Sequence, residues 1–324
     1  MNRKSKKILS LLISTMLVGS LLVGCSANKT AEKKTTTKVA QTEKGKTATT
    51  YVDGSYITDA KWLSQNLKNK DVLLLDARSD KDYAKGHIPG AVNVAWQGFS
   101  NMVGKPGDKG WGVVLSDDKL SEKLSAIGVD KNKKIVIYCD NKNGWGEDGR
   151  FVWMLKMAGI ENAKMLNGGF DFWESSKFEV SKEATSPVAS SFKIEKSNKA
   201  MTINTAELKA KLGKVKILDS RAKDEYTGAV KFGEARGGHI PGAINLTFSS
   251  LFNEDKTFKS ADEIEKIFKA AGLNKKDEIV TYCTAGIRSA HLALALKMMG
   301  YNNVKNYDES FYTWAKDTSL KIEK

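Results

Sequence analysis

The chain has 324 residues, with 52 basic and 38 acidic side chains and a formal net charge of +14. Its three cysteines and three histidines are too few and too scattered for a disulfide framework or a metal site. The excess charge is partly concentrated before residue 51, where no aromatic residues alternate with the basic ones as a nucleic-acid groove requires. We therefore expect no metal, no cofactor and no nucleic-acid partner, and attribute the basic charge to anionic lipid head groups, cell-wall polymers or solvation alone.

The first 24 residues have the features of a secretory signal. A basic start precedes an apolar stretch, residues 8–23, that is too short and too interrupted by Ser and Gly for a comfortable membrane span. Leu22-Val23-Gly24-Cys25 then resembles the lipobox of bacterial lipoproteins, in which the chain is cut before the cysteine and its thiol is lipidated. An ordinary secretory signal or an uncleaved anchor is the alternative. We expect residues 1–24 to be a lipoprotein signal peptide and Cys25 to anchor an extracytoplasmic protein to the bacterial cell membrane.

Residues 25–50 are rich in Lys, Thr and Ala and have almost no large apolar side chains. Such a segment cannot bury enough surface to offset the entropy of ordering it. We expect a flexible tether here.

The remaining sequence contains one domain twice. Four sequence blocks recur in the same order at offsets of about 140 to 150 residues, too long a period for a solenoid. The paired blocks are 73–78 and 216–221, 86–93 and 238–245, 134–139 and 278–283, and 170–173 and 311–314. We predict a first domain over 51–185, a linker over 186–200 and a second domain over 201–324.

Each copy alternates short apolar runs with helical patterns. In the second copy, Asn204 to Glu207 and Ser260 to Glu263 predict capping boxes, and Gly272 and Gly300 fall where helices would end. Runs of Ile, Val and Leu between helices are typical of parallel strands covered on both faces. The fold class is therefore α/β, with two tandem domains that each have an open, mostly parallel sheet and bind ligands beyond the carboxyl ends of the strands.

Cys283 is the chemical centre that the sequence predicts. It ends the apolar run 278–282 and precedes a tight loop, residues 284–289, and an apolar helical pattern over 290–299. Five backbone N–H groups of such a loop, with the positive end of the helix dipole, would surround the sulfur and favour its anion. We predict a thiolate nucleophile.

The first copy differs at the equivalent position. Four residues separate Cys283 from Arg288, whereas ten residues, three of them acidic, separate Cys139 from Arg150. Acidic neighbours raise the pKa of a thiol and repel anionic substrates, and a longer loop cannot close as one compact ring of donors. We therefore expect a structural role for Cys139 and catalysis in the second copy alone.

Together these motifs resemble the tandem-domain rhodaneses, the thiosulfate and 3-mercaptopyruvate sulfurtransferases. The resemblance covers about residues 57–316 and implies two rhodanese-like domains, the first without catalysis. It places the catalytic cysteine at Cys283 and the substrate-binding loop at Thr284, Ala285, Gly286, Ile287 and Arg288. It also implies a small sulfur-containing anion as donor, a Cys283 persulfide, and a cyanide or thiol acceptor such as a redoxin.

Several charged side chains near this loop allow two interpretations each. Arg288 could orient an anionic donor or stiffen the loop through a salt bridge. Asp219 and Arg221 could pair with each other or with Glu225. His291 could favour the Cys283 anion or simply pack in the core. The repeated His87 and His239 are expected to shape the Gly-His-Ile-Pro-Gly turn.

The choice of donor follows from departures from the family pattern. The loop matches neither the basic loop of thiosulfate enzymes nor the Cys-Gly-Ser-Gly loop of mercaptopyruvate enzymes, and it resembles that of single-domain rhodaneses. Glu225 stands where the two-domain enzymes commonly have a substrate-binding arginine. This favours thiosulfate or a polysulfide over 3-mercaptopyruvate, with Lys231 and Arg236 as possible sources of positive charge.

Two further functions compete with sulfur transfer. A dual-specificity phosphatase would use a similar thiolate, but such enzymes have five residues between cysteine and arginine. A surface-anchored binding module with little turnover would not require a thiol at a helix N-terminus.

Overall fold

The computed structural model describes residues 50–324, which all fall within one compact unit. The predicted signal peptide, Cys25 and the tether up to residue 49 lie outside the described residues. None of the described helices is both long and apolar enough to cross a bilayer.

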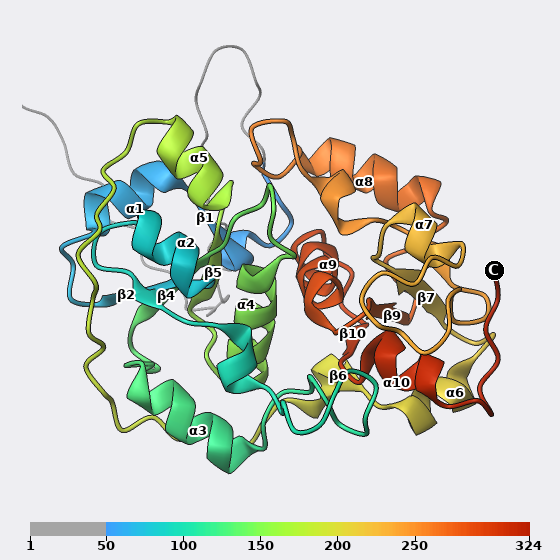
Figure 1. Cartoon of the computed structure of the whole chain (residues 1–324). Helices are drawn as coiled ribbons and strands as arrows, with labels where there is room; N and C mark the ends of the chain where they lie inside the picture. The colour runs from blue at the N-terminus through green and yellow to red at the C-terminus, as the bar shows by residue number, and fades with distance from the viewer. Residues whose placement is uncertain (1–49) are drawn as a thin grey trace, which may run out of the picture. The chain divides into compact units, whose positions relative to one another are not determined.

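Two five-stranded parallel sheets confirm the predicted fold class (Figure 1). The first has the strand order β1-β5-β4-β2-β3 and the second has the equivalent order β6-β10-β9-β7-β8. The strands of the first sheet are β1 (Ile57–Thr58), β2 (Val72–Asp76), β3 (Val92–Asn93), β4 (Lys134–Tyr138) and β5 (Ala163–Leu166). Those of the second are β6 (Thr202–Ile203), β7 (Lys216–Asp219), β8 (Ile244–Asn245), β9 (Ile279–Tyr282) and β10 (Val304–Tyr307).

Helices cover both faces of each sheet, because the central strands are buried on both sides. One face of the first sheet packs on α1 (Ala60–Asn66), α2 (Asp80–Lys85) and α5 (Gly169–Ser175), and the other on α3 (Asp117–Ala126) and α4 (Glu147–Met157). The second sheet is covered by α6 (Thr205–Lys211), α7 (Lys223–Tyr226) and α10 (Ser310–Lys316) on one face, and by α8 (Ala261–Ala270) and α9 (Ile287–Met298) on the other.

The two domains share one of the hydrophobic clusters of the core. Helices α4 and α9 pack against each other between the sheets, and a single buried cluster contains side chains of both domains. The predicted linker packs on the first domain: the Ser190 N–H donates to the Ser125 carbonyl at 2.9 Å, and Phe192 and Ile194 are buried. The interface between the domains is therefore centred on α4 and α9.

The caps predicted in the second domain form as expected. Asn204 with Glu207 and Ser260 with Glu263 make reciprocal capping boxes at the starts of α6 and α8. Gly300 has a φ of +85° just after α9, as a helix terminator requires. Helix α9 begins at Ile287, three residues before the predicted start, because the loop after Cys283 is shorter than expected.

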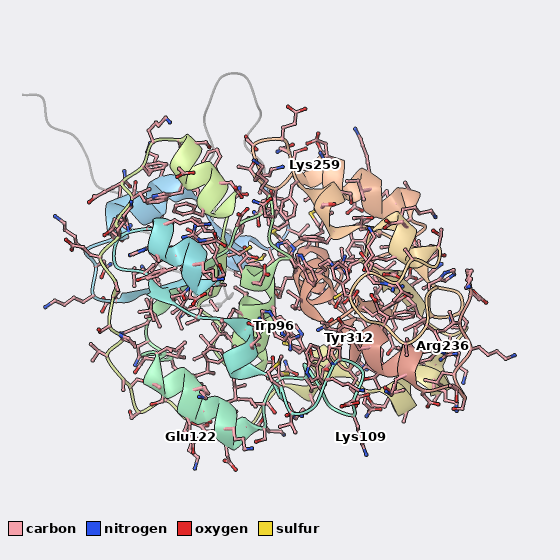
Figure 2. The ribbon with its side chains drawn as sticks, viewed as in Figure 1. Trp96, Lys109, Glu122, Arg236, Lys259 and Tyr312 are labelled. Carbon is pink, nitrogen blue, oxygen red and sulfur yellow. The ribbon has the colours of Figure 1, made fainter. Side chains whose placement is uncertain are left out.

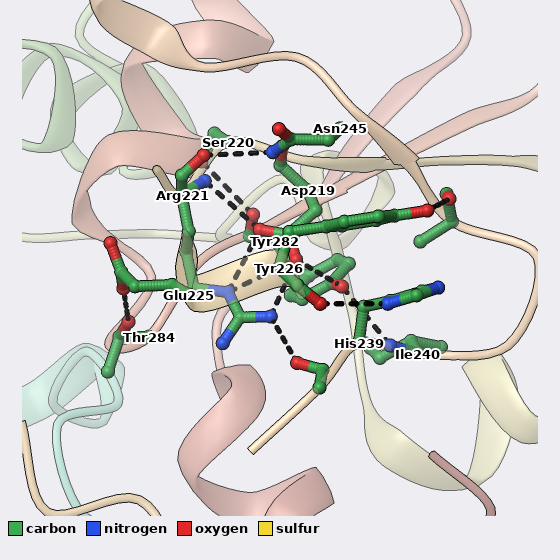
Figure 3. A network of polar contacts seen from close by, with 12 residues as sticks. Asp219, Ser220, Arg221, Glu225, Tyr226, His239, Ile240, Asn245, Tyr282 and Thr284 are labelled. Carbon is green, nitrogen blue, oxygen red and sulfur yellow. Dashed lines mark hydrogen bonds and ion pairs between the residues drawn. The ribbon is translucent and has the colours of Figure 1, made fainter. Parts of the chain in front are cut away.

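A buried ion pair fixes the end of β7. Arg221 donates from Nη2 to Asp219 Oδ2 at 2.6 Å and to the Gly238 carbonyl at 2.7 Å, and the Tyr282 hydroxyl donates to the same Asp219 oxygen at 2.6 Å (Figure 3). His239 lies flat on Tyr226, with ring centroids 3.7 Å apart. Asp219 and Arg221 therefore pair with each other, and the histidine shapes the turn. The first domain repeats this arrangement with Asp76, Arg78 and His87.

Replacing Asp219 with alanine should lower the free energy of unfolding by about 3 to 5 kcal/mol, because it leaves a buried arginine charge without its partner. Urea unfolding followed by circular dichroism measures this loss. The matched control is Glu195→Ala, which removes an exposed pair with Lys131 and should cost less than about 1 kcal/mol. Equal losses for the two variants would contradict the structural role of the buried pair.

Candidate active site

Cys283 directly follows β9 and is 1% exposed. Its carbonyl accepts the Phe311 N–H at 2.9 Å, and the Thr284 carbonyl accepts the Tyr312 N–H at 3.2 Å, so α10 holds the start of the loop. The Ser289 hydroxyl, in the first turn of α9, lies 3.6 Å from the sulfur and donates to it. A strand end, a helix N-terminus and a hydroxyl therefore converge at one thiol.

The loop leaves its backbone donors available. Gly286, the N-cap of α9, has a φ of +78° and no side chain caps the helix. Within residues 50–324, the N–H groups of Thr284, Ala285 and Gly286 have no protein acceptor. Unpaired N–H groups at a helix N-terminus are an anion-binding arrangement. Among the described residues, the second domain thus has unoccupied backbone donors beside Cys283, in a loop that is itself buried.

The equivalent loop of the first domain fills itself with its own carboxylates. Asp140 accepts the N–H groups of Lys142 and Asn143 at 2.8 and 3.0 Å, and Glu147 accepts that of Trp145 at 2.7 Å. The donors that could hold an external anion are therefore already occupied.

Cys139 lies buried beneath this filled loop. Burial raises its pKa well above the usual value, and the charges of Asp148 and Glu147 raise it further. Its thiol donates to the Asn141 side chain at 3.3 Å. The environment of Cys139 is that of a structural thiol.

Arg288 is buried beneath the Cys283 loop. Its two terminal nitrogens donate to the two carboxylate oxygens of Glu225 at 2.7 and 2.8 Å, and one also reaches the Thr284 hydroxyl at 2.9 Å. That hydroxyl donates to Glu225 at 3.0 Å (Figure 3). Burial alone would raise the pKa of Glu225, but Arg288 outweighs it and holds this pKa below the usual range. Of the two interpretations, the structure shows the salt bridge that stiffens the loop.

The other basic groups considered from the sequence are engaged elsewhere. Lys231 is exposed and pairs with Asp224. Arg236 donates to the carbonyls of Trp314, Ala315 and Leu320 at the end of α10. That these two residues supply positive charge to the donor site stays a prediction, although both side chains already have partners in their own domain.

His291 packs in the shared core. It is fully buried on α9, stacks on Phe258 with centroids 5.2 Å apart, and burial lowers its pKa, against the opposing charge of Asp148. A neutral, packed imidazole agrees with the second of the two interpretations.

An aromatic rim surrounds the loop. Ala285, Ile287 and Tyr312 form a small apolar cluster, and four half-buried rings pack on it: Trp96, Trp111, Trp145 and Phe232. Trp96 and Tyr312, labelled in Figure 2, come from different domains. The Trp145 and Phe232 rings lie 4.6 Å apart, and the Arg288 guanidinium lies 5.3 Å from the Trp145 ring. The long loop of the first domain thus covers the loop of the second.

Sequence reasoning missed two residues that meet at this site. Arg150 and Asp308 form a buried ion pair across the domain boundary, and Arg150 also contacts the loop. A sequence feature could have indicated each of them. Arg150 is the repeat equivalent of Arg288, and Asp308 directly follows β10, at the carboxyl edge of the sheet next to Cys283. No group of side chains within residues 50–324 forms a metal site.

The described residues form a parallel α/β domain twice, with a cysteine at a strand-to-helix loop in each. Carboxylates accept N–H groups of the first loop, whereas those of Thr284, Ala285 and Gly286 in the second have no acceptor within the described chain. The rhodanese-like domain model matches residues 59–176 and 204–317, so the chain belongs to the rhodanese family.

Relatives are found among named proteins and solved structures. The chain is 29% identical to the sulfur carrier protein TtuD of Thermus thermophilus over 85% of its own length and 98% of that protein's. It is 28% identical to a thiosulfate sulfurtransferase of Corynebacterium glutamicum, covering 84% and 92%. An anaerobic ergothioneine biosynthesis enzyme of Chlorobium limicola shares the fold, with a TM-score of 0.73, 22% identity and coverage of 83% and 70%.

Glu147, which fills the first loop, should make stability depend on pH. Burial raises its pKa from 4.5 to about 7, so between these values the folded protein keeps a proton that the unfolded chain releases. The free energy of unfolding therefore falls as pH rises through this window, by up to about 1.4 kcal/mol per pH unit.

Glu147→Gln keeps an acceptor for the Trp145 N–H and removes the titration. Its stability relative to the wild type should increase steadily from pH 4.5 to 7 and then level off, as measured by urea unfolding at each pH. Parallel profiles for the two proteins would contradict the assignment.

Proposed function

We propose that the protein is a sulfurtransferase that uses Cys283 as its nucleophile and residues 284–288 as the cradle for the transferred sulfur. One observation carries the proposal: the loop N–H groups are free in the second domain and occupied by Asp140 and Glu147 in the first. The names of the two relatives, a thiosulfate sulfurtransferase and a sulfur carrier, support it.

The reaction balances without an external oxidant or reductant. The Cys283 thiolate attacks the outer sulfur of thiosulfate, the sulfur–sulfur bond of the donor breaks, and its electron pair leaves with sulfite. The terminal sulfur of the new Cys283 persulfide carries the negative charge, which the loop N–H groups stabilise. Cyanide or a thiolate, including that of a redoxin, then attacks this sulfur. The electron pair of the persulfide bond returns to Cys283 and restores the thiolate.

The surroundings of the loop favour a small donor without a carboxylate. At the position of the family's usual arginine lies Glu225, whose carboxylate is already paired with Arg288. A 3-mercaptopyruvate carboxylate would meet a like charge there, which disfavours binding. Thiosulfate or a polysulfide can bind through the loop N–H groups alone. We therefore infer that these are the donors.

Incubation with thiosulfate should add one sulfur atom to the protein, seen by intact mass spectrometry, and cyanide should remove it as thiocyanate. Cys283→Ser should abolish this loading, since it removes the thiol that lies beside the unpaired loop N–H groups. The matched control is Cys139→Ser, which should load like the wild type.

A donor panel of thiosulfate, polysulfide and 3-mercaptopyruvate sharpens the test. We expect kcat/KM for 3-mercaptopyruvate to be at least about tenfold below that for thiosulfate. Loading that survives in Cys283→Ser would overturn the assignment. Phosphate-ester hydrolysis without any sulfur loading would favour the phosphatase instead, and the absence of both would favour a binding module.

We also propose that Cys25 carries a lipid and anchors the protein outside the cytoplasm. The support is the sequence alone: a basic start, a short apolar stretch and a small residue before the cysteine. The 24 or so residues between Cys25 and the first described residue would then separate the folded domains from the membrane surface.

Full-length protein expressed in a bacterial host should incorporate radiolabelled palmitate and sediment with membranes. Cys25→Ser should lose the label and release the protein from the membrane fraction, because a single thiol accepts the lipid. Cys139→Ser is the control and should keep both properties. Label that persists in Cys25→Ser would refute the anchor.

A further inference from the structure

Arg150 of the first domain reaches into the catalytic loop of the second. Arg150 lies on α4 and is 2% exposed. Its Nη1 donates to the Gly286 carbonyl at 3.2 Å and to Asp308 Oδ1 at 2.5 Å. Its other terminal nitrogen is held in its own domain by the Ser100 hydroxyl at 3.2 Å and the Gly112 carbonyl at 2.8 Å. The guanidinium is therefore fixed from both sides of the boundary.

Comparison of the two repeats explains why Arg150 reaches into the other domain whereas Arg288 stays within its own. Arg288 turns beneath its own loop because Glu225 accepts it there. The position equivalent to Glu225 in the first domain is Asp82, which is half-exposed on α2 and pairs with Lys85. Arg150 finds its carboxylate in Asp308 instead, and a buried arginine needs such a partner.

The contact acts on one peptide group of the cradle. The Gly286 carbonyl accepts from Arg150 on one side and from the Asn306 amide, at 3.3 Å, on the other. The same peptide carries the Ile287 N–H, the first donor of α9, which points away from the carbonyl. Holding the carbonyl fixes the direction of this N–H, and the charge on the guanidinium polarises the peptide and strengthens the N–H as a donor.

The space around Gly286 is correspondingly tight. A Cβ at this position would lie 2.8 Å from Asp308 Oδ1 and 3.0 Å from Arg150 Nη1, and the backbone has a φ of +78°. Both features restrict this position to glycine. The loop conformation and the cross-domain pair therefore depend on each other.

We propose that Arg150 is a positioning residue for sulfur transfer, acting through the peptide between Gly286 and Ile287. The inference rests on the proposed function of the Cys283 loop and deepens it. It gives the first domain a direct role: although its own loop is filled, it supplies the group that aligns the open one.

The pseudo-symmetry of the repeat offers a matched control. Asp308 Oδ2 accepts the Val114 N–H of the first domain at 2.9 Å, and its equivalent Asn167 accepts the Phe258 N–H of the second domain at 2.8 Å. Asn167→Ala therefore removes one buried cross-domain hydrogen bond from the side of the filled loop and leaves the contacts of Arg150 untouched.

The test compares Arg150→Met, Arg150→Lys and Asn167→Ala in the full chain. Single-turnover loading by thiosulfate and alkylation of Cys283 by iodoacetamide at pH 7 should both slow roughly tenfold in Arg150→Met. Arg150→Lys should recover only part of the rate. It keeps the positive charge but lacks the two terminal nitrogens with which the guanidinium contacts both domains. Asn167→Ala should lower Tm less than Arg150→Met does, because it removes a neutral hydrogen bond, and both rates should stay at the wild-type value.

The two readouts separate the possible failures. If wild-type protein does not load sulfur, the proposed function fails. The alkylation rates of Cys283 still test whether Arg150 positions the loop. Two results would overturn the inference and leave Arg150 a merely structural role. In the first, Cys283 of Arg150→Met is alkylated and loaded as fast as in the wild type. In the second, Asn167→Ala slows both reactions as much as Arg150→Met does. Should Arg150→Met fail to fold, Asp308→Asn replaces it: it keeps an oxygen for the Val114 N–H, weakens the hold on Arg150, and should slow both reactions severalfold.

Discussion

Two arginines at equivalent positions of the repeat are buried, and each needs a carboxylate. This requirement organises the site. In the second domain Glu225 satisfies Arg288 from below the loop, so the loop N–H groups face no carboxylate of their own. In the first domain Arg150 pairs with Asp308 across the boundary, while Asp140 and Glu147 occupy the loop donors. The positions of the acidic side chains thus determine which loop has N–H groups left for an external anion. They also determine which domain sends its arginine to the loop of the other.

The sequence predicts what is local or repeated. Capping boxes, strand ends, the Asp219 and Arg221 pair and the position of Cys283 all follow from short patterns, because each is determined within a few residues or appears twice. The partners of Arg150 and of Arg288 could not be predicted, since 158 and 63 positions separate them from Asp308 and Glu225. The partners of Arg236 were hidden for the same reason, because only the folded chain brings this side chain to the end of α10.

The aromatic rim changes what the filled loop of the first domain means. From the sequence this loop is a degenerate copy whose extra residues only lengthen it. In the fold, those residues bring Trp145 over Phe232 and beside the Arg288 guanidinium. A charged group that is enclosed by rings and paired below is poorly hydrated, so the electrostatic effect of the cradle is screened less by water. Lengthening one loop therefore encloses the other.

Division into two domains does not make the second one independent. Helix α9 carries the loop at its N-terminus and buries nearly all of its side chains, many of them against α4 in the core that both domains share. A fragment that began at residue 201 would expose this apolar helix face, and it would lose Arg150 and Trp145 from the loop. The cradle is thus built from one domain and held in shape by two. This explains in physical terms how a domain with a filled loop still contributes to a site on its neighbour.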